Sequence, residues 1–138
     1  MYCGSPISGR SFLPHNAYLQ TQQPIRLPPW HEPEPDASVI RGRFDDSTAK
    51  PLAADVLSVI EVADRSLARD LGTKRRVYAE AGIPQYVVVD LVHDVVLDHA
   101  NPAGGTYSPP NLLRKGDTLR ISAGGGQFVE VPVDRLLP

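Results

Sequence analysis

The sequence has little cysteine and little excess charge of either sign. Its 138 residues include one cysteine, Cys3, and fourteen Lys and Arg against sixteen Asp and Glu, for a net charge of -2. A single thiol excludes an intramolecular disulfide framework and a multi-thiolate zinc site. The charge balance argues against a protein that binds nucleic acid through bulk positive charge alone.

The sequence also lacks a long apolar run. Its best run, Tyr86–Val89, stops at Asp90, far short of the roughly 20 apolar residues that span a bilayer. The first residues do not show the basic start and apolar stretch of an export signal. We therefore expect a cytoplasmic protein with no membrane partner.

Proline, by contrast, is abundant at the front of the chain. Eight of the fourteen prolines lie within the first 51 residues. Residues 1–35 are rich in Pro, Gln and Ser and show no sustained helical or strand period, except for a short extended piece at 24–28. We expect a poorly structured N-terminal segment over 1–35 and one domain over 36–138.

The rest of the chain predicts an α/β domain. Residues 55–62 form a nearly continuous aliphatic run, which is typical of a strand covered on both faces. Residues 66–81 predict the main helix, ended by Gly82, and Tyr86–Asp90 predicts a second buried strand. This order suggests a βαβ unit with a parallel pair. Shorter strands are expected at 37–41, 95–98, 106–108, 118–121 and 128–131.

One lysine lies on the wrong face of the predicted helix. At 100° per residue, Leu67, Leu71, Tyr78 and Ala81 form one apolar stripe, and Lys74 falls in its middle. Burying an unpaired ammonium costs several kcal/mol. Lys74 either extends past its neighbours to solvent or meets a charged partner on the sheet.

Two carboxylates are candidates for that partner. Glu61 ends the aliphatic run, where it is either paired, metal-bound or turned to solvent. Asp36 follows Pro35 and precedes a short strand, although Pro-Asp is also a common turn pair. Two carboxylates and a lysine suit metal-assisted phosphodiester hydrolysis, because carboxylates hold Mg²⁺ and a lysine can position the attacking water. A plain salt bridge between Glu61 and Lys74 is the alternative.

A local basic run accompanies these residues. Arg65, Arg69 and Arg75 are candidate DNA contacts, with a solvated helix face as the alternative interpretation. Contact through such a patch predicts modest, strongly salt-dependent affinity. The four histidines match no zinc spacing, and His93 and His99 are expected at the surface.

The candidate residues belong to a set of linked segments in a fixed order, namely 34–36, 38–42, 60–66, 70–74, 78–86 and 88–90. With these segments the sequence resembles the Uma-two family of restriction endonucleases, within the PD-(D/E)XK nuclease superfamily, from about residue 24 to 138. The resemblance implies a restriction-endonuclease-like mixed sheet with one main flanking helix (66–81) and C-terminal β-strands. It also implies a Mg²⁺-dependent DNA endonuclease, with Mn²⁺ as a possible substitute.

The resemblance also assigns roles to residues. Asp36 and Glu61 would bind the metal together with the Val62 backbone carbonyl, and Lys74 would be the catalytic lysine, displaced from the usual strand position to the helix. Asp70 and Tyr78 are possible supporting residues, one turn to either side of Lys74.

The family's usual N-terminal covering helix has no counterpart in the sequence. We therefore also consider a homodimer that covers the exposed sheet face, a catalytically inactive nuclease-fold binding or scaffold protein, and a truncated remnant that folds poorly alone.

Overall fold

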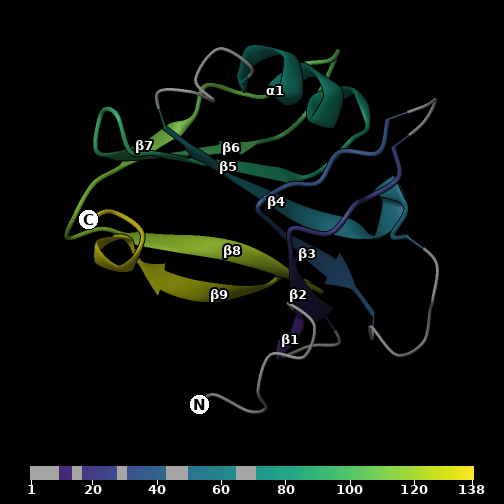
Figure 1. Cartoon of the computed structure of the whole chain (residues 1–138), viewed down its shortest axis with the longest axis horizontal. Helices are drawn as coiled ribbons and strands as arrows, with labels where there is room; N and C mark the ends of the chain where they lie inside the picture. The colour runs from purple at the N-terminus through teal and green to yellow at the C-terminus, as the bar shows by residue number, and fades with distance from the viewer. Residues whose placement is uncertain (1–9, 14–16, 28–30, 43–49, 65–70) are drawn as a thin grey trace.

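The protein is built on one seven-stranded mixed sheet, seen in a computed structural model that describes residues 10–13, 17–27, 31–42, 50–64 and 71–138 (Figure 1). Its strands lie side by side in chain order: β1 (Arg10–Leu13), β2 (Ala17–Thr21), β3 (Ala37–Arg41), β4 (Val56–Ala63), β5 (Gln85–Asp90), β6 (Val95–Ala100) and β7 (Asn111–Leu113). All neighbours are antiparallel except β4 and β5, which run parallel. The helix α1 (Leu71–Glu80) lies between these two strands in the chain, so the predicted βαβ unit is confirmed.

The sheet is covered on both faces. On β5, Tyr86 and Val88 belong to the core beneath α1, whereas Val87 and Val89 pack against the other side. That other side is covered by a two-stranded sheet of β8 (Thr118–Gly124) and β9 (Gln127–Pro132), visible below β5 and β6 in Figure 1. The continuous aliphatic runs of β4 and β5 follow from this double burial.

Helix α1 ends where the sequence predicts. Gly82 has a φ of +77°, a left-handed conformation that is strained for residues with a Cβ. The amide of Gly82 donates to the Ala79 carbonyl, and the amide of Ile83 donates to the Tyr78 carbonyl. These two bonds make the Schellman motif that satisfies the last carbonyls of a helix. The expected start at Ser66 lies outside the described residues.

The expectation of a poorly structured front is wrong for β1 and β2. Both are strands of the main sheet, and β2 pairs along its whole length with β3. Tyr18 lies buried in the core beneath α1. A periodicity analysis does not detect these strands, because each is only four or five residues long. The sheet therefore extends to residue 10 instead of beginning at 36.

Two other expected strands differ from the structure. Around residues 106–108 there is only an isolated bridge from Thr106 to Ala103, and the strand β7 lies at Asn111–Leu113 instead. Residues 109 and 110 are prolines, which have no amide to donate to a ladder. In the described part of the 24–28 piece, Ile25 and Leu27 are buried, and only Arg26 and Leu27 form isolated bridges.

His99 is buried, so the expectation of a surface position is wrong for it. Its side chain is 3% exposed on β6, with Nδ1 3.0 Å from the Tyr86 carbonyl oxygen. The ring lies against the rings of Tyr86 and Tyr107. His93, in contrast, is exposed beside Asp90 as expected. Burial lowers the pKa of His99, because desolvation disfavours the charged imidazolium.

The lowered pKa of His99 predicts a loss of stability in acid. A depressed folded-state pKa contributes stability that is present above the unfolded value of about 6.5 and is lost as the pH falls through the folded value. We expect His99→Phe to flatten the fall in unfolding free energy below about pH 6.5, by up to about 1.4 kcal/mol per pH unit. Urea denaturation across this range measures the slope. Parallel curves for wild type and variant would contradict the prediction.

A buried amide joins the main sheet to β8. Gln85 Oε1 accepts hydrogen bonds from Ser58 Oγ and the Ser122 amide, and its Nε2 donates to Asp98 Oδ1 and the Arg120 carbonyl. Every polar position of the Gln85 side-chain amide is thereby used. The network fixes the β8–β9 layer against β4, β5 and β6.

Two buried serines should respond oppositely to alanine substitution. Ser58→Ala removes a hydrogen bond to Gln85 and should destabilise the fold by about 1 kcal/mol. Ser38 Oγ is equally buried, yet it has no hydrogen-bond partner within the described structure, so Ser38→Ala should be neutral or stabilising. Denaturant midpoints test both variants. A loss for Ser38→Ala as large as that for Ser58→Ala would contradict the assignment.

Candidate functional site

A buried acid meets a lysine and a tyrosine beneath α1. Glu61 shares the α1 side of β4 with Val59 and Ala63 and is 3% exposed. Its Oε2 lies 3.4 Å from Lys74 Nζ and accepts a hydrogen bond of 3.0 Å from the Tyr78 hydroxyl. Lys74 and Tyr78 reach one oxygen together because they lie one turn apart on the helix. The sequence placed Lys74 on the sheet-facing stripe, and the structure confirms that position.

Burial dominates the electrostatics of Glu61. Desolvation raises the pKa of its carboxyl, and the nearby charge of Asp36 adds to this. The Lys74 ammonium and the Tyr78 hydrogen bond act in the opposite direction without reversing the shift. Lys74 keeps about a third of its side chain exposed, so it can contact Glu61 and a ligand from solvent at once.

Asp36 reaches the same end of β4. It directly precedes β3, and Ala37, the first residue of β3, pairs with Ile60 of β4. Its Oδ2 accepts a hydrogen bond of 2.7 Å from the Val62 amide, beyond the point where the ladder ends. Its backbone also hydrogen-bonds Glu61. Asp36 and Glu61 are therefore neighbours, and residue Val62 lies against Asp36.

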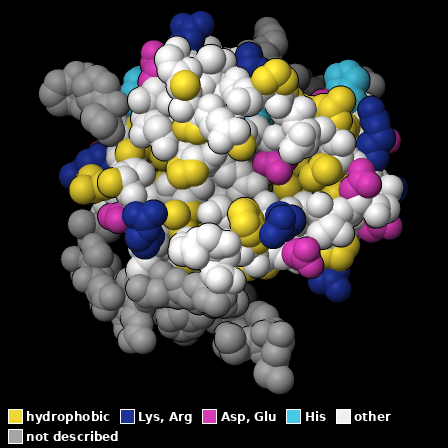
Figure 2. Space-filling view, turned by 180° about the vertical axis from the view of Figure 1, so that it is seen from behind, with side chains coloured by type: hydrophobic (Ala, Val, Ile, Leu, Met, Phe, Trp, Pro, Cys, Tyr) yellow, Lys and Arg dark blue, Asp and Glu magenta, His cyan; other side chains and the backbone are white. Residues whose placement is uncertain are grey.

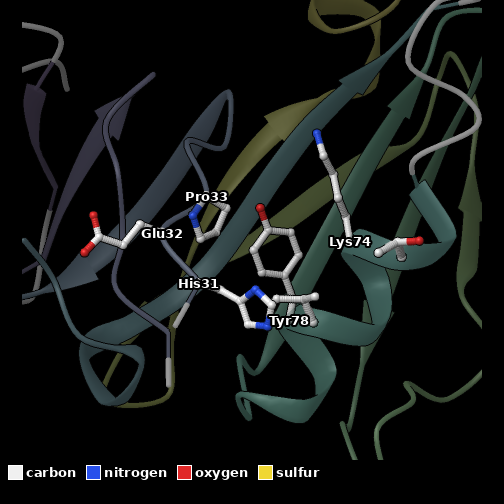
Figure 3. A pocket seen from close by; sticks show the side chains of 7 residues that line it. His31, Glu32, Pro33, Lys74 and Tyr78 are labelled. Atoms are coloured by element: carbon white, nitrogen blue, oxygen red, sulfur yellow. The ribbon is translucent and has the colours of Figure 1, made fainter. Parts of the chain in front are cut away.

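A pocket of about 320 Å³ opens beside these residues. Figure 3 shows the Tyr78 hydroxyl and Lys74 Nζ toward one end of it and the His31 ring toward the other. The other described residues that line it are Glu32, Pro33, Thr73 and Val77. Sequence reasoning missed His31, Glu32 and Thr73 as site residues.

A backbone turn delivers His31 to this place. The His31 amide donates to the Leu27 carbonyl, and the Leu27 amide donates to the His31 carbonyl. The Ile25 amide donates to the Pro33 carbonyl. Ile25 and Leu27 are completely or almost completely buried, so they anchor the turn. The alternation of Ile25 and Leu27 between prolines was the available signal, but it pointed only to an extended piece.

The structure does not place several of the predicted site residues in the site. Arg65, Arg69 and Asp70 lie outside the described residues. Arg75 is exposed on α1, and its role as a DNA contact stays a prediction. Among the residues that are described, no group of three or more His, Cys, Asp or Glu side chains could hold a metal ion.

In the view from behind, the described residues show no surface patch of a single charge sign. There, Lys and Arg side chains are interspersed with Asp and Glu (Figure 2).

Within the described part of the chain, no helix is long and apolar enough to cross a membrane.

The mixed sheet, its parallel pair flanked by one helix, and the C-terminal strands define an α/β nuclease-like fold. The chain belongs to the Uma2 family: a family model described as "Uma2: Putative restriction endonuclease" matches residues 10–133. That membership indicates a nuclease. A comparison with curated proteins finds no match.

Proposed function

We propose that the protein is a metal-dependent DNA endonuclease that hydrolyses phosphodiester bonds in an active site formed by Asp36, Glu61 and Lys74. The observation that carries the proposal is the buried Glu61 carboxylate, ion-paired with Lys74 and lying beside Asp36. Membership in the Uma2 family supports the reaction class. Burying a carboxylate next to a second one destabilises a fold, and such arrangements are typical of functional sites.

The donor set fits Mg²⁺. Asp36 and Glu61 supply two carboxylates within reach of each other, and the Val62 backbone carbonyl is the proposed third donor. Mg²⁺ is usually bound by one or two carboxylates together with waters and substrate phosphates, so the absence of a larger described acidic cluster is compatible with it. A bound Mg²⁺, or Mn²⁺ in its place, would polarise the phosphate and lower the pKa of a water.

The chain's own side chains would perform the remaining tasks. Lys74 donates hydrogen bonds from a partly exposed ammonium, which orients a water and offsets charge that develops on phosphoryl oxygens. Tyr78 donates to Glu61 Oε2 and fixes the carboxylate's orientation. The Val62 amide holds Asp36 in the same way. Tyr78 is 1% exposed, so it acts as a positioning residue.

Cleavage of supercoiled plasmid tests the proposal. We expect nicking with Mg²⁺ or Mn²⁺ and none with chelator, and we expect Asp36→Asn to reduce the rate at least about a hundredfold. Glu130→Gln, which alters an exposed acid on β9, is the control. Activity without divalent metal, or full activity of Asp36→Asn, would contradict the proposal and indicate a contaminant or another site.

A further inference from the structure

We propose that the pocket between His31 and Lys74 takes one unpaired nucleotide of the DNA, with its phosphate at the Lys74 end and its base at the His31 end. The inference rests on the proposed function and adds a substrate form to it: a single strand, an end or an extruded base, in preference to an intact duplex.

The pocket's volume points to a small ligand. At about 320 Å³ it lies at the lower end of the range for small-molecule sites. A paired base in an intact helix cannot enter a pocket of this kind without leaving the stack. A nucleotide that is already unpaired enters without that penalty.

The two ends of the pocket differ in chemistry. At one end, Lys74 Nζ and the Tyr78 hydroxyl lie next to the Glu61 carboxylate, where a phosphate would meet a cation beside the proposed metal site. At the other end the exposed imidazole of His31 adjoins Tyr78 (Figure 3). An imidazole offers a flat face for stacking and ring nitrogens for hydrogen bonds to a base.

The walls favour a base over a second phosphate. Pro33 and Val77 line the pocket with apolar surface, and the Thr73 hydroxyl adds one neutral hydrogen-bonding group. Stacking on apolar and aromatic surface is tolerant of base identity. The pocket is therefore expected to bind a nucleotide with little sequence preference.

The one acid among the described lining residues is turned away from the ligand. Glu32 points away from His31 and Tyr78 in Figure 3. Its carboxylate pairs with Lys50 at 2.5 Å and with Arg26 at 3.5 Å. Those cations also lower the pKa of Glu32. Its charge is thus compensated outside the pocket, and repulsion of the DNA backbone is reduced.

Binding without turnover tests the inference. Fluorescence anisotropy in chelator compares a labelled short oligothymidylate with its duplex of equal length. We expect the single strand to bind at least about tenfold more tightly. We expect His31→Ala and the pocket-filling Thr73→Trp to weaken strand binding about five- to a hundredfold, the range for losing one stacked base. His93→Ala and Thr118→Trp are matched controls at exposed positions outside the pocket, and they should change nothing.

A competition experiment separates the base from the phosphate. Thymidine monophosphate should displace the labelled strand at lower concentration than deoxyribose 5-phosphate, and Thr73→Trp should abolish the difference. Equal displacement by both competitors, or equal affinity for strand and duplex, overturns the inference. Because Thr73 is exposed on α1, the variant should fold, and His31→Ala provides a second test if it does not.

The outcomes distinguish this inference from the proposed function. Strand binding that depends on His31, without any metal-dependent cleavage, would support nucleotide binding in the pocket and contradict the proposed nuclease activity. Metal-dependent cleavage that is unaffected by His31→Ala and Thr73→Trp would support the nuclease activity and contradict nucleotide binding in the pocket.

Discussion

Glu61→Gln is expected to abolish metal-dependent cleavage while raising the stability of the metal-free protein by about 1 kcal/mol, or a few degrees in Tm. The substitution keeps the shape of the side chain and removes a charge that is 3% exposed. The amide oxygen that it introduces would still accept the hydrogen bond from Tyr78. Lys74 would lose its ion-pair partner but keep the third of its side chain that is already solvated.

The expected gain follows from the balance of forces on Glu61. The pKa of this carboxyl is raised, and burial is the largest cause. Lys74 and Tyr78 therefore do not fully compensate the desolvation of the charge. An acid kept at such a position lowers stability, which is a common consequence of preserving a functional site.

Thermal unfolding with and without Mg²⁺ measures both parts of this prediction. Mg²⁺ should raise the Tm of the wild type, because a ligand that binds only the folded state stabilises it, and it should leave Glu61→Gln unchanged. Glu130→Gln, at an exposed position, should behave as the wild type. A clearly destabilised Glu61→Gln would mean that the Glu61–Lys74 pair holds the fold together and is not maintained for function.

The sequence was most informative where a charged residue lay among apolar neighbours. Lys74 in an apolar stripe and Glu61 in an aliphatic strand each require a partner, and the structure pairs them. The charge pattern identified both residues before any fold was known. That the pair is catalytic stays a prediction, since an ion pair alone has the same geometry.

The parts that sequence reasoning missed depend on long-range contacts. His31 reaches the site only because Ile25 and Leu27 bury themselves beneath α1, an arrangement with no local period. β2 forms because β3 offers it an edge to pair with, and β1 pairs in turn with β2. His99 is buried because Tyr86 and Tyr107 enclose it. In each case a tertiary partner outweighs a weak or misleading local signal.

Lys74→Met should reduce the cleavage rate at saturating DNA about 10²- to 10³-fold, the usual effect of losing one donor to a developing oxyanion. Methionine keeps much of the stem's apolar contact and removes the ammonium. Arg76→Met, which alters an exposed cation on the same helix, controls for the loss of one positive charge and should lower affinity only slightly. A defect in Lys74→Met that high DNA concentration restores would indicate a binding role in place of a catalytic one.

The same variant should also weaken the fold, because it leaves Glu61 buried without its cation. We expect a loss of about 1–2 kcal/mol, below the roughly 3–5 kcal/mol of a fully buried pair, since Lys74 is about one-third exposed. In the Glu61→Gln background the loss should nearly vanish, because no buried charge remains to be compensated. A double-mutant cycle of the two substitutions, measured by urea denaturation, isolates this coupling. A coupling near zero would show that Glu61 and Lys74 do not interact in solution, and the ion pair on which the proposed site depends would be lost with it.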